Sequence, residues 1–169
     1  MPSDDGLLPS SFEPEQVIRV LHKHGVRYVL IGGLAAALHG SPQPTVDIDL
    51  TPEQSGANLD ALASALRELG ATRTTDIHNL RPPNDRNDFI ERVEVFFSAV
   101  GEVDVLREAL GVGGYAELIN DSVAFVLSGI EIKVMSLESL IESKEVANRI
   151  KDQLALVQLR LLRDELNNS

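Results

Sequence analysis

The amino-acid sequence predicts an α+β fold, a mixed sheet flanked by helices, and three observations support it. Helical and strand-like segments are mixed along the chain without strict strand–helix alternation. Hydrophobic residues make up 43% of the chain, which is typical of a globular protein. The length of 169 residues fits one domain. We therefore expect a loose lead-in over residues 1–10 and a single domain over residues 11–169.

The first half of the chain carries short helices and strands. Pro14 suits the first turn of a helix that runs through His24. A buried strand over 28–31 precedes two glycines and a short alanine-rich helix over 34–38. Residues 46–50 alternate apolar and acidic side chains, as a strand does. A helix that Gly70 closes has its apolar positions at Leu59, Leu62, Ala63, Leu66 and Leu69.

The second half begins with residues 76–88, whose composition is that of a loop. A tight turn at Gly101 and a hairpin turn at Ser128-Gly129 join pairs of expected strands. Ser136 can cap the first of two closing helices. The strands and helices expected here lie at 93–100, 102–106, 115–119, 123–127, 130–135, 137–146 and 149–166.

The net charge of −11 argues against affinity for nucleic acid through a broad basic surface. A local basic patch remains an option, supplied by Arg73, Arg81, Arg86 and Arg92. No cysteine is present, which excludes disulfides and thiolate zinc sites. The apolar stretches are too short for a membrane span, and the first residues carry acids rather than a basic signal-peptide start. We therefore expect a cytoplasmic protein without a membrane partner.

The pair Gly32-Gly33 and the segment Asp47-Ile48-Asp49 together indicate a site. A strand, a glycine turn and a helix start place bare backbone N–H groups where an anion can bind. The period-two spacing of Asp47 and Asp49 puts both carboxylates on one strand face. Two adjacent carboxylates repel, and a divalent cation relieves the repulsion. The alternative is a turn beside the solvent-facing side of an edge strand.

Asp104 repeats the acidic pattern on a later strand. Three aspartates on neighbouring strands, close to a glycine turn, would form an oxygen-rich site for one or two magnesium ions holding a nucleoside triphosphate. The apolar flanks of Asp47 and Asp49 favour this interpretation, since they imply a strand packed into the sheet.

Lys144 and Asp152 lie on otherwise apolar faces of the two closing helices. Lys144 shares its face with Leu137 and Leu140 at helical spacing. Its stem could simply cover apolar surface while the ammonium reaches water. Asp152 could equally form a structural i,i+3 pair with Arg149.

With these motifs in order, the chain resembles the nucleotidyltransferase superfamily that shares the palm-like core of DNA polymerase β. The matching pieces are Ile31-Gly32-Gly33, Asp47-Ile48-Asp49 and Asp104. It looks most like the small bacterial abortive-infection (AbiEii-like) toxin nucleotidyltransferases. In those, a Gly-x-x-Asp segment and a late Lys-x-x-Ala-x-Arg-x-Lys-Asp segment recur, here at 101–104 and 144–152.

The resemblance implies a role for each site residue. Gly32 and Gly33 would contact the triphosphate through backbone amides. Asp47, Asp49 and Asp104 would hold Mg²⁺ or Mn²⁺, with Asp104 also favouring deprotonation of the attacking hydroxyl. Lys144 would contact phosphate and the leaving pyrophosphate, with Asp152 near the same pocket. The implied activity is metal-dependent transfer of a nucleoside monophosphate from an NTP, such as ATP, to an acceptor hydroxyl.

The acceptor and the biological role stay open at this stage. The acceptor hydroxyl could belong to a tRNA 3′ end, a partner protein or a small molecule, and the resemblance allows a toxin–antitoxin or phage-defence system. Relatives often carry an arginine where this chain has Gln43. For that reason the competing hypothesis is a nucleotide-binding or partner-binding module that keeps the fold with weak catalysis. A plain divalent-cation site is a third alternative.

Overall fold

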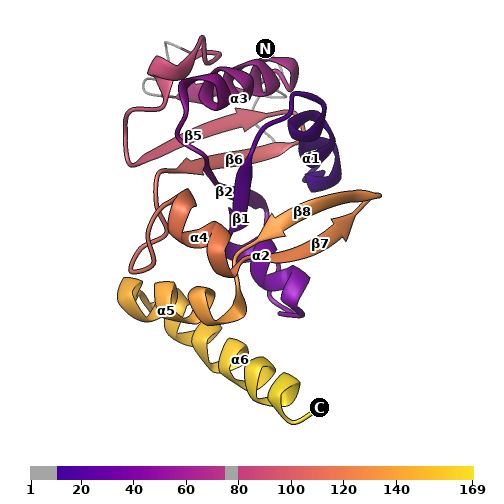
Figure 1. The fold of residues 1–169 in the computed structure, drawn as a ribbon, viewed down its shortest axis with the longest axis vertical. Coiled ribbons are helices and arrows are strands. Elements are labelled where there is room, and N and C mark those ends of the chain that lie inside the picture. Colours follow the sequence, from indigo (N-terminus) through magenta and orange to yellow (C-terminus); the bar gives the residue numbers. More distant parts are fainter. Residues whose placement is uncertain (1–10, 75–79) are drawn as a thin grey trace, which may run out of the picture.

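The computed structural model describes residues 11–74 and 80–169 (Figure 1). The expected lead-in over residues 1–10 lies outside this part of the chain. Its helices are α1 (Pro14–Lys23), α2 (Gly32–His39), α3 (Gly56–Glu68), α4 (Tyr115–Asp121), α5 (Leu137–Ala147) and α6 (Ile150–Asn167), with a 3₁₀ turn, η1, at Arg86–Asp88.

Within the described residues, eight strands form one mixed sheet in the order β4-β3-β5-β6-β2-β1-β8-β7. The pairs β2–β6 and β1–β8 are parallel and the other pairs antiparallel. The predicted α+β fold is thereby confirmed. The strands are β1 (Tyr28–Ile31), β2 (Asp47–Pro52), β3 (Thr72–Thr74), β4 (Leu80–Arg81), β5 (Val93–Ser98), β6 (Gly101–Leu106), β7 (Val123–Leu127) and β8 (Ile130–Val134).

The core is built on the apolar side chains of the central strands. Ile48, Leu50 and Val103 are fully buried and join one cluster with the buried residues of α1 and α3. Those two helices lie together beside β5 and β6, whereas α5 and α6 form the opposite end of the molecule (Figure 1). In β6 and the first part of β2, alternate residues are buried in the core and the others project from the second face of the sheet.

Most expected elements are present, and three details differ. The described part of the expected loop at 76–88 contains β4 and η1. The strand β4 forms because it pairs with β3, a strand that was not predicted. Gly101 is the first residue of β6, since Ser98 pairs with it and the turn is Ala99-Val100. The helix α2 begins at Gly32 rather than after the two glycines.

Among the described residues, no helix is long and apolar enough to cross a membrane.

Candidate active site

Four carboxylates share one face of the sheet, at the centre of its strand order. In the parallel pairing of β2 with β6, Asp49 lies opposite Asp104 and Asp47 lies opposite Glu102. The intervening residues point into the core, so the acidic side chains project together on the other face. Because β2 lies between β1 and β6, the edge-strand interpretation of Asp47 and Asp49 is wrong.

Three of these carboxylates can meet one cation. One oxygen of each of Asp47, Asp49 and Asp104 lies within 4.8 Å of the others. The Thr45 hydroxyl donates a hydrogen bond to Oδ1 of Asp47 over 3.1 Å. Oδ1 of Asp104 is buried and has no hydrogen-bond partner. A buried carboxylate oxygen without a donor is costly, and a bound divalent cation would satisfy it.

The crowding of carboxylates raises the pKa values of two of them, Asp49 and Asp104. Burial, and then the charge of Asp47, raises the pKa of Asp49 to about 6. Burial, with the charges of Asp49 and Glu102, raises the pKa of Asp104 to about 8. Each carboxylate therefore opposes ionisation of its neighbours, which a divalent cation between them would offset. The donor set and its electrostatics both fit Mg²⁺ or Mn²⁺.

The two glycines bring the start of α2 against these carboxylates. Gly32 has a φ of +69°, and a Cβ there would lie 2.1 Å from Oδ2 of Asp49. A Cβ on Gly33 would lie 2.8 Å from Oγ1 of Thr45. The backbone N–H of Gly33 also donates to the Asp49 carboxylate. The N-cap residue, Ile31, offers no side-chain cap, so the positive dipole end of α2 faces the cavity beside Asp49 and favours an anion there.

One cavity of about 780 Å³ joins all the predicted site residues. Its walls come from β1, β2, β6, the start of α2, α5 and the beginning of α6. The predicted residues that line it are Gly32, Gly33, Asp47, Asp49, Asp104, Lys144 and Asp152. Gln43, at the position where the resemblance leads one to expect an arginine, lines it as well. The fold thus collects in one place residues that are spread over most of the sequence.

Lys144 and Asp152 form an ion cluster at the junction of α5 and α6. The Asp152 carboxylate is fully buried; Nε of Arg149 donates to it over 2.6 Å, and Nζ of Lys144 lies 3.4 Å away. Burial opposes ionisation of Asp152, but the hydrogen bonds from Arg149 and the charges of Lys144 and Arg149 outweigh it and keep the pKa lowered. The structural Arg149–Asp152 pair is therefore present, and it holds Asp152 at the wall of the cavity.

Three further residues near the predicted site residues were not assigned to the site by the sequence prediction. Glu102 shares the face of Asp104 and its charge acts on that carboxylate. Its position two residues before Asp104 on the same strand was the available signal. Arg149 and Lys151 line the cavity as cations beside Lys144. Both belong to the late Lys-x-x-Ala-x-Arg-x-Lys-Asp segment of the family resemblance, which was the available signal. The turn between α5 and α6 then decides where they point.

Two of the described histidines, His24 and His39, have structural partners. Nε2 of His39 lies 2.8 Å from the carbonyl oxygen of Met135, and its ring packs edge-on against Phe125. His24 lies 2.5 Å from a carboxylate oxygen of Glu68. His78 lies outside the described residues.

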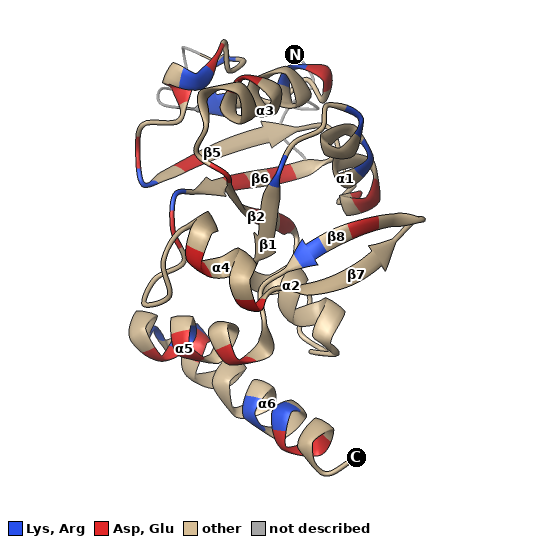
Figure 2. Cartoon of the chain, in the orientation of Figure 1, with Lys and Arg blue, Asp and Glu red and all other residues tan. Residues whose placement is uncertain are grey.

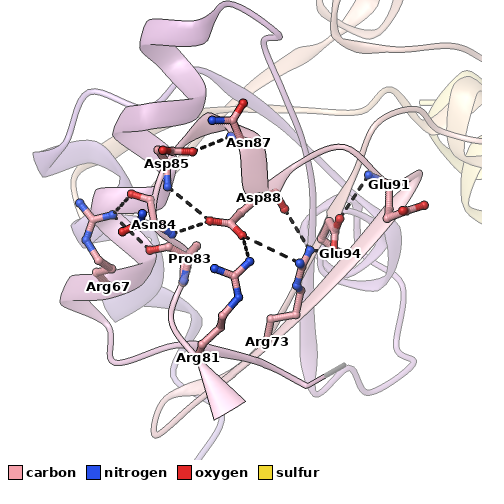
Figure 3. Close-up of polar contacts among 10 residues, drawn as sticks. All are labelled: Arg67, Arg73, Arg81, Pro83, Asn84, Asp85, Asn87, Asp88, Glu91 and Glu94. Atoms are coloured by element: carbon pink, nitrogen blue, oxygen red, sulfur yellow. Dashed lines mark hydrogen bonds and ion pairs between the residues drawn. The ribbon is translucent and has the colours of Figure 1, made fainter. Parts of the chain in front are cut away.

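The proposed basic patch does not form, because each of its arginines contacts a carboxylate. Arg73 and Arg81 both bond to the buried Asp88, and Arg73 also bonds to Glu94 over 2.5 Å (Figure 3). Further along the chain, Arg86 is paired with Asp60 and Arg92 with Glu108. Basic and acidic residues are interspersed over the elements in Figure 2.

Solved structures with this architecture are similar to the chain at low sequence identity. A nucleotidyltransferase structure from Thermotoga maritima is 18% identical over 95% of this chain and 98% of that chain, with a TM-score of 0.55. The lincosamide antibiotic adenylyltransferase LnuA, with lincomycin bound, is 16% identical over 90% of this chain and 99% of that one, with a TM-score of 0.63. ANT(2″)-Ia in complex with adenylyl-2″-tobramycin is 16% identical over 90% of this chain and 87% of that chain, with a TM-score of 0.57.

These likenesses establish a shared fold. No curated protein matches the chain by sequence. The sequence profile of one family, described as nucleotidyl transferase of unknown function (DUF2204), matches residues 13–168. The match agrees with the superfamily that the motifs predicted, whereas the likeness to abortive-infection toxins stays a prediction. Because the profile covers nearly the whole chain, the protein belongs to this family of nucleotidyl transferases.

Proposed function

We propose that the protein transfers a nucleoside monophosphate from an NTP to an acceptor hydroxyl and releases pyrophosphate, with Mg²⁺ or Mn²⁺ as cofactor. The observation that carries this proposal is a single cavity in which three carboxylates adjoin the N-terminus of α2. Carboxylates are the metal ligands and helix N–H groups the phosphate ligands that such a reaction needs.

Asp47, Asp49 and Asp104 would hold the divalent cation. When bound, the cation would supply charge neutralisation to the triphosphate and polarise the phosphate that reacts. The buried and unpartnered oxygen of Asp104 supports its inclusion among the ligands. Glu102, opposite Asp47 in the sheet, adds negative charge beside Asp104.

The protein groups around this site bind and orient the substrates. The start of α2 donates backbone N–H hydrogen bonds to the phosphates, and Lys144 offsets charge on the departing pyrophosphate. The acceptor oxygen forms a bond to the α-phosphorus as the bond from that phosphorus to the bridging oxygen breaks. The hydroxyl proton passes to the Asp104 carboxylate and from there to water.

A small-molecule hydroxyl is the acceptor that we favour over a tRNA end. The net charge of −11 repels a polyanion, and the four arginines considered for a basic patch are paired with carboxylates. Among the solved structures of this fold, LnuA has lincomycin bound and ANT(2″)-Ia holds an adenylylated tobramycin. For this chain we propose the same broad class, an uncharged or cationic molecule that bears a hydroxyl.

Mass spectrometry after incubation tests this function. The protein, mixed NTPs and Mg²⁺ are combined with a panel of hydroxyl-bearing small molecules or with cell lysate. A nucleotide mass increment on an acceptor, with pyrophosphate release, is expected for wild type and for Glu142→Gln, which removes an exposed carboxylate elsewhere. Asp47→Asn should lose it. Transfer by Asp47→Asn at the wild-type rate, or no transfer by wild type, would overturn the proposal.

The position of Gln43 favours a second candidate, a nucleotide-binding module with weak catalysis. Its side chain lines the cavity where relatives often place an arginine. Under this alternative, calorimetry finds tight NTP binding while no acceptor is modified. Gln43→Arg should then raise turnover at least tenfold, about 1.4 kcal/mol of transition-state stabilisation. Turnover by wild type that Gln43→Arg leaves unchanged would exclude this candidate.

A further inference from the structure

The wall of the cavity that α5 and the start of α6 form carries more positive than negative charge. Lys144, Arg149 and Lys151 line it, and Asp152 is the single carboxylate that residues 137–167 contribute to the lining. Three cations therefore share one anion, and two positive charges are left without compensation. In a chain with a net charge of −11, such an excess at one wall of a cavity indicates a place for an anionic ligand.

Asp152 compensates Lys144 and Arg149, and Lys151 is the cation that is left over. Nε of Arg149 donates to the buried Asp152 carboxylate over 2.6 Å, and Nζ of Lys144 lies 3.4 Å from it. The side chain of Lys151 forms no hydrogen bond or ion pair with any residue that the structure describes. It also lies in the first turn of α6, where the helix dipole disfavours a cation. The stability of α6 therefore gives no reason for a lysine at this position.

The acidic residues of the surrounding elements leave this basic wall uncompensated. None of the glutamates of α5 lines the cavity, and two of them pair with arginines of α6 instead. Glu108 does line the cavity, but it bonds to Arg92 over 2.7 Å. The remaining carboxylates of the lining are the three aspartates of the proposed metal site, and no ion pair joins them to a cation within the described residues. The cavity thus has an acidic pole on the sheet and a basic pole at the helices.

A polyphosphate is the ligand that suits both poles. One phosphate would be held through the metal that the three aspartates bind. The other phosphates need positive groups, and the side chains of arginine and lysine are suited to them. Lys144 and Arg149 bond to the same carboxylate, so a phosphate that reaches Lys144 also comes close to Arg149. An acceptor without negative charge would gain nothing from this wall, which favours the nucleotide as its ligand.

We propose that Arg149 and Lys151, beside Lys144, bind the terminal phosphates of the NTP and, after transfer, the pyrophosphate. Because NTP is the substrate under the proposed function, the identity of this ligand rests on that function. Lys151 makes the larger contribution, since the charge of Arg149 is shared with Asp152. The protein should therefore bind a triphosphate better than a monophosphate, and Lys151 should account for part of the difference.

Calorimetry with inorganic tripolyphosphate and saturating Mg²⁺ tests the basic wall without a nucleoside or an acceptor. Lys151→Gln should weaken binding about tenfold, the usual worth of a hydrogen bond to a charged group. Lys151→Arg should keep most of the affinity. Arg19→Gln is the matched control and should bind as wild type does, because it removes one positive charge from an exposed position on α1, outside the cavity. No binding by wild type, or equal affinity of Lys151→Gln and Arg19→Gln, would overturn the proposal.

Nucleotides test which phosphates the basic wall binds. With Mg²⁺ present, Lys151→Gln should weaken binding of α,β-methylene ATP and leave binding of AMP unchanged, because AMP lacks the terminal phosphates. Equal weakening of both would place Lys151 at the nucleoside or the α-phosphate and would contradict the assignment.

The phosphate site and the transfer reaction fail in different ways. If tripolyphosphate binding depends on Lys151 while wild type modifies no acceptor, the phosphate site stands and the proposed transfer is wrong. If wild type transfers a nucleotide while Lys151→Gln binds tripolyphosphate as tightly as wild type, the transfer stands and the phosphate site is wrong.

Discussion

At the scale of single residues, Gly32 shapes the site through the side chain that it lacks. Its φ of +69° is favourable for glycine alone, and a Cβ would collide with the Asp49 carboxylate. Gly70 has nearly the same φ, +67°, but nothing lies within 4 Å of its Cβ position. A comparison of the two glycines therefore separates the cost of backbone strain from the cost of displacing Asp49, a proposed metal ligand.

Gly32→Ala should destabilise the protein more than Gly70→Ala and should disable the site. Gly70→Ala is expected to cost about 1 kcal/mol of unfolding free energy from left-handed strain alone. Gly32→Ala should cost about 2 kcal/mol or more and should abolish thermal stabilisation by Mg²⁺ with an NTP. Thermal unfolding with and without ligand measures both effects. Equal behaviour of the two variants would mean that the contact with Asp49 is unimportant.

Asp104 should make the metal-free protein less stable as pH rises. Its pKa of about 8 in the folded protein exceeds the ordinary value near 4, so its favourable contribution is complete below pH 4 and is lost on the way to pH 8. Asp104→Asn should therefore raise the unfolding free energy at pH 8 by about 1–2 kcal/mol, allowing for partial solvent screening. At pH 4 the gain should vanish.

Thermal unfolding in EDTA at the two pH values measures this effect. Glu142→Gln, which neutralises an exposed carboxylate, is the control and should show no such pH-dependent gain. A loss of stability in Asp104→Asn at pH 8 would contradict the prediction, because it would mean that the ionised Asp104 carboxylate stabilises the folded protein.

At the scale of elements, the register of two strands and the turn between two helices build the cavity. The pairing of β2 with β6 sets Asp49 opposite Asp104, and a shift by one residue would send every acid into the core. Asn148, at φ +48°, ends α5 in the left-handed conformation and lets α6 start beside it. This turn brings Asp152 to Lys144, eight residues earlier in the chain.

Asp152→Asn should weaken that junction. The buried carboxylate compensates Arg149 and Lys144, so its neutralisation should cost about 2–4 kcal/mol at pH 7. Because the pKa of Asp152 is lowered in the folded protein, its contribution is present above pH 4 and is lost as pH falls through the lowered pKa. The cost of the substitution should shrink accordingly in acid.

Chemical denaturation at pH 7 and pH 3 measures the effect of Asp152→Asn. Asp164→Asn, on the exposed end of the same helix, is the control and should cost less than 1 kcal/mol by the usual worth of surface pairs. If Asp152→Asn were neutral at pH 7, the ion cluster would not hold the two helices together.

At the scale of the whole molecule, the chain is acidic, and three of its carboxylates lie together in the cavity, where a cation could neutralise them. The net charge of −11 coexists with arginines that are mostly paired, and the strongest carboxylate crowding lies in the cavity. A cation bound by all three carboxylates should thus stabilise the folded state more than a cation bound by a single carboxylate would.

Mg²⁺ with an NTP should raise the unfolding free energy by about 2.7 kcal/mol at a hundred times the dissociation constant. The temperature midpoint should rise by roughly 5–10 °C for a chain of this size. Asp47→Asn should lose the shift, whereas Glu142→Gln should keep it. Stabilisation of Asp47→Asn equal to that of wild type would place the nucleotide elsewhere.

The sequence predicted most of the fold because its patterns are local. Hydrophobic spacing and caps located α1, α3, β5 to β8, α5 and α6 within a few residues, and the expected cap at Ser136 accepts a bond from the Ser139 N–H. The strand β3 and the short β4 escaped prediction, since they exist through pairing with β5 and through the contacts of Arg73 and Arg81 with Asp88. Such contacts join residues whose separation leaves no periodic signal.

The sequence by itself determined which residues can serve a metal and a phosphate, because residue type and spacing along one strand or helix fix the chemistry and the face. The glycine pair and the three aspartates were identified in this way. Only the tertiary structure decided that these residues share a cavity with Lys144 and Asp152, that Arg149 and Lys151 join them, and that the candidate arginines are paired. The physical reason is that these outcomes depend on strand register and on helix packing between distant segments. The free energy of the whole fold determines both, and no local sequence pattern encodes them.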